Sequence, residues 1–175
     1  MLNYFYFSVN YAPGEGIYDL IIKGTSYERD NGNFECRKVE SGSGKRLHTS
    51  TVELVVLLPP GAPNLSPANP ILTESRPFNI SCASTGGSPP PVITWFKNNE
   101  PGDFNVVYEA SRTRDQPSIS TLIVSPSKED DGSEFKCSVW NRAIAKEQTM
   151  EEQTTIFVNC KFFKRLIQFF ENFIY

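Results

Sequence analysis

A seven-residue pattern that ends in a cysteine occurs twice in this chain, about a hundred residues apart. The first copy is DNGNFEC, residues 30–36, and the second is DGSEFKC, residues 131–137. In each copy an acidic residue and a glycine come before an alternation that places a phenylalanine and a cysteine on one side of an extended chain. Both copies therefore predict a half-buried strand that begins after an acidic turn.

Each copy also follows another alternating segment. YDLIIK, residues 18–23, lies before the first copy, and STLIV, residues 120–124, lies before the second. Two strands joined by an acidic corner, the second with an inward cysteine, are typical of strands E and F of an immunoglobulin-like sandwich. The length of 175 residues leaves room for two such domains.

The second copy has the other elements of this sandwich upstream. FNISC supplies Cys82, VITWF supplies Trp95, and the strand that contains Phe135 supplies Cys137, in the order cysteine, tryptophan, cysteine. A cross-sheet disulfide packed against a tryptophan of strand C is the core of these domains. We therefore predict an all-β, immunoglobulin-like sandwich of the I-set or C2 kind, with a Cys82–Cys137 bond and with Trp95 and Phe135 in the core.

The domain organisation follows from which strands each copy has. Residues 1–58 supply strands E, F and G only, so we expect the C-terminal half of one domain there. Residues 59–64 are rich in proline and predict a short semi-rigid hinge. Residues 65–158 predict a complete domain, and residues 159–175 a tail. The strands expected in the complete domain are A at 71–73, B at 78–83, C at 92–97, C′ at 106–109, E at 120–124, F from Phe135, and G at 154–158.

Cysteine usage favours disulfides over metal binding. The four cysteines include no C-x-x-C pair, and the single histidine, His48, leaves too few ligands for a zinc site. The half domain has no strand-B cysteine, so Cys36 is expected to be unpaired. Cys160 lies beyond the last strand and is also expected to be unpaired. A Cys36–Cys160 bridge would need the two Cα atoms to lie within about 7 Å.

The two ends of the chain differ from the rest in composition. The start, MLNYFYFSVNYAPGEG, has no basic region and no clear cleavage site, so no signal peptide is predicted. The end, CKFFKRLIQFFENFIY, has the apolar spacing of an amphipathic helix that could lie on a membrane, and we expect it not to be native to the fold. No run of about 20 apolar residues predicts a membrane span, so membrane attachment would need parts missing from this chain.

Three stretches, YDLIIKGTSYERDNGNFECRK, GGSPPPVITWFKNNE and EDDGSEFKCSVWNRA, resemble consecutive immunoglobulin domains of Echinoid-like insect cell-adhesion receptors. They are more distantly similar to nephrin-type adhesion molecules. The resemblance covers roughly residues 16–158. It implies a domain of a large single-pass ectodomain that mediates homophilic or heterophilic adhesion at cell contacts.

The residues give no support for catalysis or for cofactor binding. SGSGKR lacks the spacing of a phosphate-binding loop and predicts a hairpin loop instead. Residues 129–131 are acidic but belong to a solvated turn, with no calcium-binding loop after them. The formal charge is −3, from 17 basic and 20 acidic residues, which disfavours nucleic acid as a partner. We therefore predict no enzyme, no metal and no cofactor.

Three non-enzymatic functions are left: an adhesion module, a passive spacer in a larger ectodomain, and an intracellular structural domain of the sarcomere type. The cysteine pair and two glycosylation sequons, at Asn64 and Asn79, favour the extracellular side of the plasma membrane. Alternation turns Asn79 outward on the A-B-E sheet. On the C-F-G sheet, Phe96 and Trp140 face outward, close together, and form the predicted contact for a protein partner, either a second copy or another immunoglobulin-type receptor.

Overall fold

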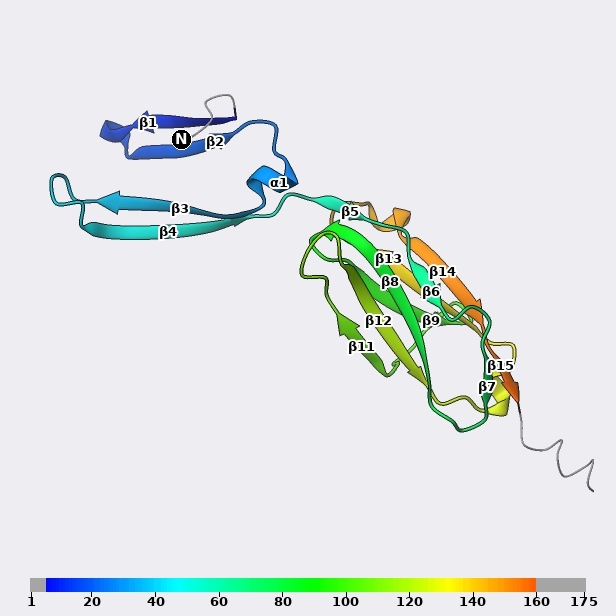
Figure 1. The fold of residues 1–175 in the computed structure, drawn as a ribbon. Helices are drawn as coiled ribbons and strands as arrows, with labels where there is room; N and C mark the ends of the chain where they lie inside the picture. Colours follow the sequence, from blue (N-terminus) through cyan, green and yellow to red (C-terminus); the bar gives the residue numbers. More distant parts are fainter. Residues whose placement is uncertain (1–5, 160–175) are drawn as a thin grey trace, which may run out of the picture. The chain divides into compact units, whose positions relative to one another are not determined.

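The structure, a computed structural model, describes residues 6–159. The chain divides into two compact units, Met1–Leu57 and Leu58–Tyr175. Antiparallel strands dominate both units (Figure 1). The predicted all-β fold is therefore confirmed.

The second unit is a sandwich of two sheets. One sheet has the order β11–β12–β8–β5, with β6 also paired to β8, and the other has the order β10–β9–β13–β14. Near the end of the described chain, β15 pairs in parallel with β7. The strands are β5 (Leu58–Pro60), β6 (Asn64–Ser66), β7 (Ile71–Thr73), β8 (Phe78–Ser88), β9 (Val92–Lys97), β10 (Glu100–Pro101), β11 (Val106–Glu109), β12 (Pro117–Val124), β13 (Glu134–Trp140), β14 (Met150–Thr155) and β15 (Phe157–Asn159).

The core of the sandwich comes from the inward positions of these strands. β8 buries Ile80 and Cys82, and β12 buries Leu122 and Val124. β13 alternates between half-buried and buried residues along its whole length. Burying one large aliphatic side chain contributes about 1.5–3 kcal/mol, so the period-two pattern of these strands accounts for much of the unit's stability.

Residues 59–64, predicted as a hinge, differ from that expectation. Leu58–Pro60 form β5, which pairs with the end of β8, and β8 runs to Ser88, past its predicted end. The N–H of Gly61 donates to the carbonyl of Thr85 at 2.7 Å, and a Cβ at Gly61 would lie 2.7 Å from the same oxygen. Only glycine permits that approach. Pro59 and Pro60 lie on this edge strand, where a missing N–H is tolerated.

Residues 106–109, predicted as strand C′, lie in a different sheet from the one expected. They form β11, which pairs with β12 in the opposite sheet. The strand beside β9 is instead β10, which follows a turn with positive φ at Asn98 and Asn99. A short alternating strand has the same sequence pattern in either sheet, so the pattern did not decide which neighbour it joins.

The first unit contains two hairpins. One hairpin pairs β1 (Phe7–Ala12) with β2 (Ile17–Ile22), through a 3₁₀ turn at Pro13–Glu15. The other pairs β3 (Gly32–Val39) with β4 (Arg46–Leu54). A short helix, α1 (Tyr27–Asp30), lies between the hairpins in the chain. Strand β1 was missed in the sequence, because its aromatic-rich segment was considered only as a leader peptide.

Candidate protein-binding face

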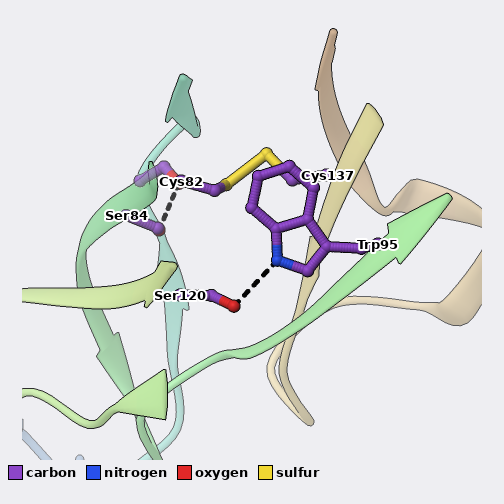
Figure 2. Close-up of a disulfide and its surroundings, with 6 residues drawn as sticks. Cys82, Ser84, Trp95, Ser120 and Cys137 are labelled. Carbon is purple, nitrogen blue, oxygen red and sulfur yellow. Dashed lines mark hydrogen bonds between the residues drawn. A yellow bond between two sulfur atoms is a disulfide. The ribbon is translucent and has the colours of Figure 1, made fainter. Parts of the chain in front are cut away.

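A disulfide between Cys82 of β8 and Cys137 of β13 joins the two sheets of the second unit (Figure 2). The two Cα atoms lie 6.5 Å apart, and both cysteines are buried. Figure 2 shows the indole of Trp95 beside the bond, and its Nε1 donates to Oγ of Ser120 at 2.9 Å. Phe135 is 3% exposed in the same core. The predicted disulfide is confirmed, and the buried indole nitrogen has its acceptor.

The acidic turn before β13 is a structural cap. Residues Lys128–Asp130 form a 3₁₀ turn, and the carboxylate of Asp130 accepts from the N–H and Oγ of Ser127 at 2.7 and 2.9 Å. Lys97 of β9 donates to the other oxygen of Asp130. Burial alone would raise the pKa of Asp130, but these donors outweigh it and hold the pKa below its ordinary value. The turn thus anchors β13 to β9.

The same turn occurs in the first unit with a small difference. The carboxylate of Asp30 accepts from the N–H of Ser26 at 2.8 Å and pairs with Arg29. Asp30 therefore takes the part of Asp130, whereas the seven-residue pattern aligned it with Asp131. The turn of the first unit has one residue more.

The outward side of β9, β13 and β14, called here the C-F-G face, carries both predicted aromatic anchors. Phe96 and Trp140 are half-buried on it. The register pairs Phe96 with Lys136, and Trp140 with Val92. The two aromatic residues are thus four positions apart along the strands, about 13 Å at roughly 3.3 Å per residue. The expectation that they lie close together needs correction.

Phe96 and Trp140 have different neighbours within the domain. Nζ of Lys136 lies 5.2 Å from the centre of the Phe96 ring and 3.1 Å from Oε2 of Glu151. Nε1 of Trp140 donates to the carbonyl of Ile144 at 3.1 Å. Lys136 therefore covers part of Phe96, whereas Lys97 turns toward Asp130.

Val92, which sequence reasoning missed, completes an apolar patch with Trp140. It is 58% exposed, on the strand position directly opposite Trp140. The sequence could have indicated Val92, because it has the same outward position in VITWF as Phe96. The C-F-G face therefore has an apolar end at Val92 and Trp140. Lys136, opposite Phe96, and Glu151, opposite Ser138, form an ion pair farther along the face.

Asn141 is a second residue that sequence reasoning missed. It is 2% exposed, and its side-chain amide donates to the carbonyl oxygens of Leu58 and Pro89 at 2.8 and 2.9 Å. Its own Oδ1 accepts from the N–H of Ala143 at 3.0 Å. The first residue of the second unit is thus fixed to the loop between β8 and β9. The segment VWNRA held no signal for these contacts, because their partners lie 83 and 52 positions away in the chain.

The two sequons lie on the other sheet. Asn64 of β6 pairs with Ala83 of β8, and Asn79 of β8 pairs with Ile123 of β12. Both asparagines are exposed. Since Asn79 and Ala83 are four positions apart in one strand, the two asparagines point to the same side, away from the core. The structure therefore places both sequon asparagines on the sheet that does not carry Phe96 and Trp140.

The remaining predicted sites have less structural detail. Cys36 on β3 is a free, exposed cysteine. Cys160 and the predicted helical tail lie outside the described residues. Within residues 6–159, no three or more His, Cys, Asp or Glu side chains are grouped as a metal site would require. No helix in that range has the length and apolar character needed to cross a membrane.

Comparison with protein families identifies the second unit. Residues 62–141 match the model of the family described as immunoglobulin domain. The human Kin of IRRE-like protein 2 is 30% identical over 144 residues, which is 80% of this chain and 19% of that protein. The Irregular chiasm C-roughest protein of Drosophila melanogaster is 33% identical over 136 residues, 74% of this chain and 18% of that protein. The chain thus spans about a fifth of these relatives.

Shorter relatives and solved structures agree on the fold. Rat junctional adhesion molecule A is 28% identical over 121 residues, 65% of this chain and 39% of that protein. The crystal structure of Rst D1-D2 superposes with a TM-score of 0.62 at 24% identity, covering 87% of this chain and 75% of that one. The ectodomain of mouse nectin-like molecule 4 has a TM-score of 0.53 at 17% identity, covering 88% and 51%. The chain therefore contains an immunoglobulin domain at residues 62–141 and is homologous to adhesion molecules that carry such domains.

Proposed function

We propose that the chain is part of an Echinoid-like cell-adhesion receptor on the extracellular side of the plasma membrane. In this proposal the second unit recognises a protein, either a second copy or another immunoglobulin-type receptor, through its C-F-G face. The observation that carries the proposal is the apolar patch of exposed Val92 and half-buried Trp140, on the same face as the ion pair of Lys136 and Glu151.

The composition of this face suits a protein contact. Interface centres are enriched in aromatic residues, and charged groups at their rims give specificity more than affinity. Val92 and Trp140 supply an apolar contact at one end of the face, and Lys136 and Glu151 supply one charge of each sign. A face with both signs can pair with a second copy of itself, because lysine of one copy can meet glutamate of the other.

The sequons support the same choice of face. Glycans attached at Asn64 and Asn79 would cover the outward side of β6, β8 and β12, since both asparagines are exposed there. The C-F-G face would stay open. A disulfide in the core also fits the oxidising extracellular environment better than an intracellular structural role.

A passive spacer is the second candidate, and one observation favours it. Phe96 and Trp140 are separated along the strands, and each already has a neighbour, Lys136 for the ring of Phe96 and the carbonyl of Ile144 for the indole of Trp140. Aromatic side chains that already have contacts within the domain contribute less to binding a partner.

Thr94→Arg tests the proposal without removing a packed side chain. Thr94 is exposed on β9, at the centre of the C-F-G face, opposite Ser138. The matched control is Val107→Arg, an equally large change at a 50% exposed position of β11 in the other sheet. Beads coated densely with the disulfide-bonded chain should cluster through multivalent contacts. We expect Thr94→Arg to abolish clustering and Val107→Arg to preserve it. If the beads never cluster, or cluster equally with Thr94→Arg, the recognition function is contradicted and the spacer function is supported.

A further inference from the structure

The hairpin of β3 and β4 brings two basic dipeptides together. Arg37 and Lys38 lie on β3, and Lys45 and Arg46 lie across the turn, where β4 begins. Lys45 faces Glu40, whose N–H donates to its carbonyl at 2.8 Å, and Arg46 pairs with the residue before Glu40. At roughly 3.3 Å per residue along a strand and 4.8 Å between strands, the four basic Cα atoms lie within about 11 Å of one another. The register thus gathers four cations from two separate segments.

The end of this hairpin has the opposite charge from the rest of the chain. Residues 37–48 contain four basic residues and one acidic residue, whereas the whole chain carries a formal charge of −3. Every residue from 37 to 50 is exposed. An exposed group of charges of one sign attracts ligands of the opposite sign. The four basic residues, called here the basic hairpin end, therefore form a positive patch on an acidic protein.

The acidic residues near this patch are already engaged. The carboxylate of Glu40 accepts from Oγ of Ser43 at 2.6 Å, inside the turn. Nη2 of Arg37 donates to Glu35 at 2.7 Å, and Arg37 first, then the charge of Arg46, holds the pKa of Glu35 below its ordinary value. Within residues 6–159, three of the four cations form no ion pair: Lys38, Lys45 and Arg46. These three are available to an anionic ligand.

The composition of the hairpin decides among the classes of polyanion. Residues 41–44 are two serines and two glycines, and Gly42 and Gly44 have positive φ angles of 89° and 67°. Residues 37–48 contain no phenylalanine, tyrosine or tryptophan on which a nucleic acid base could stack. The exposed Val39 and Leu47 lie behind the turn, on the strands, so the leading end has no large apolar side chain to insert into a bilayer. A hydrated, linear polyanion fits this surface better than either.

We propose that the basic hairpin end binds a sulfated polysaccharide. Anionic groups repeat along such a polymer, and they would pair with Lys45 and Arg46 on one side of the turn and with Lys38 on the other. Polymers of this kind belong to the extracellular space, where a chain with the Cys82–Cys137 disulfide is stable. The proposal shares only this location with the proposed adhesive function, because it concerns the first unit and not the C-F-G face.

A fluorescent heparin octasaccharide serves as the probe, and its desulfated form, of the same length, is the control ligand. Binding to the disulfide-bonded 175-residue chain is measured by anisotropy at several salt concentrations. Lys45→Glu combined with Arg46→Glu should weaken binding at least about tenfold and reduce the salt dependence by roughly 2 in the slope of log K against log salt, one for each lost contact. The matched control, Arg76→Glu with Lys146→Glu, makes the same charge change at two exposed positions of the second unit and should alter the affinity less than about twofold.

Two further variants separate loss of the patch from loss of folding. Glu40→Gln removes the nearest negative charge and keeps an acceptor for Ser43, so it should strengthen binding about twofold, a gain that damage to the hairpin would not produce. Lys38→Glu, on the opposite strand, should weaken binding, because the register joins both strands in one patch.

Unchanged heparin binding by the Lys45→Glu, Arg46→Glu chain would overturn the proposal. Equal binding of the desulfated octasaccharide would also overturn it, as would tighter binding to single-stranded DNA or to phosphatidylserine vesicles at the same concentration of charge. None of these outcomes depends on whether beads coated with the chain cluster, so failure here is distinct from failure of the adhesive function.

Discussion

The two units of this chain share a strand pattern but differ in what lies opposite it. Leu122 on β12 is 1% exposed, whereas Leu20 on β2, at the same phase of a similar strand, is 43% exposed. Phe135 is buried between two sheets, and Phe34 is only half-buried. Alternation therefore determines which side of a strand faces inward, but burial depends on whether a second sheet is present.

Trp95→Ala should produce the largest loss in the second unit. The substitution removes a 3% exposed indole and leaves the hydroxyl of Ser120 without its donor. We expect the free energy of unfolding to fall by about 3–5 kcal/mol, measured by urea denaturation. Val92→Ala on the outward side of the same strand should cost less than about 0.5 kcal/mol. Similar losses for both variants would refute the assignment of the inward face.

Removing the disulfide should have the next largest effect. Cys82→Ala combined with Cys137→Ala opens a loop with a sequence separation of 55 residues. A loss of about 2–4 kcal/mol is expected in the same denaturation experiment. Cys36→Ala, in the first unit, should leave this transition unchanged, because Cys36 is a free, exposed cysteine. A shift on Cys36→Ala would mean that the two units are coupled.

Asp130→Asn should cost about 1 kcal/mol at pH 7, since it weakens the cap of β13 and the ion pair with Lys97. The pKa of Asp130 is lowered in the folded state, so its contribution is complete above the unfolded pKa of about 3.9 and is lost as the pH falls through the folded value. The difference between wild type and variant should therefore shrink below about pH 4. Exposed Asp103→Asn is the control. A constant difference from pH 7 to pH 2 would argue against this role of Asp130.

Val52→Ala should have the smallest effect. Val52 lies on an inward position of β4 yet is 64% exposed, so truncation removes little buried area. We expect a change below about 0.5 kcal/mol in any unfolding transition of the first unit.

The inward and outward positions within a single strand could be predicted from the sequence. The inward phases of Cys82, Trp95 and Cys137 follow from alternation, and the sandwich that they imply is observed. Features that depend on which strand pairs with which, and in what register, could not be predicted in this way. Residues 106–109 alternate in the same way in either sheet, and the separation of Phe96 from Trp140 follows from a register that the sequence of one strand does not contain.

Polar contacts between distant segments were also beyond sequence reasoning. Asn141 reaches Leu58 and Pro89, which lie 83 and 52 positions away in the chain. Nothing in its local pattern distinguishes it from a solvated asparagine after a strand. The prolines near Leu58 suggested a linker because proline is common in linkers, and only the pairing partner on β8 shows an edge strand.

The parallel pairing of β15 with β7 has a mechanical consequence. The two strands lie toward opposite ends of the second unit's sequence, with registers from Phe157–Ile71 to Asn159–Thr73. Tension along the polypeptide would pull them in opposite directions and load their hydrogen bonds in shear, all at once, and not one after another as in unzipping. After these bonds break, the disulfide still keeps the span between Cys82 and Cys137 from extending. Under force, this strand pair would resist in shear, and the domain would lengthen only by the chain outside the disulfide loop.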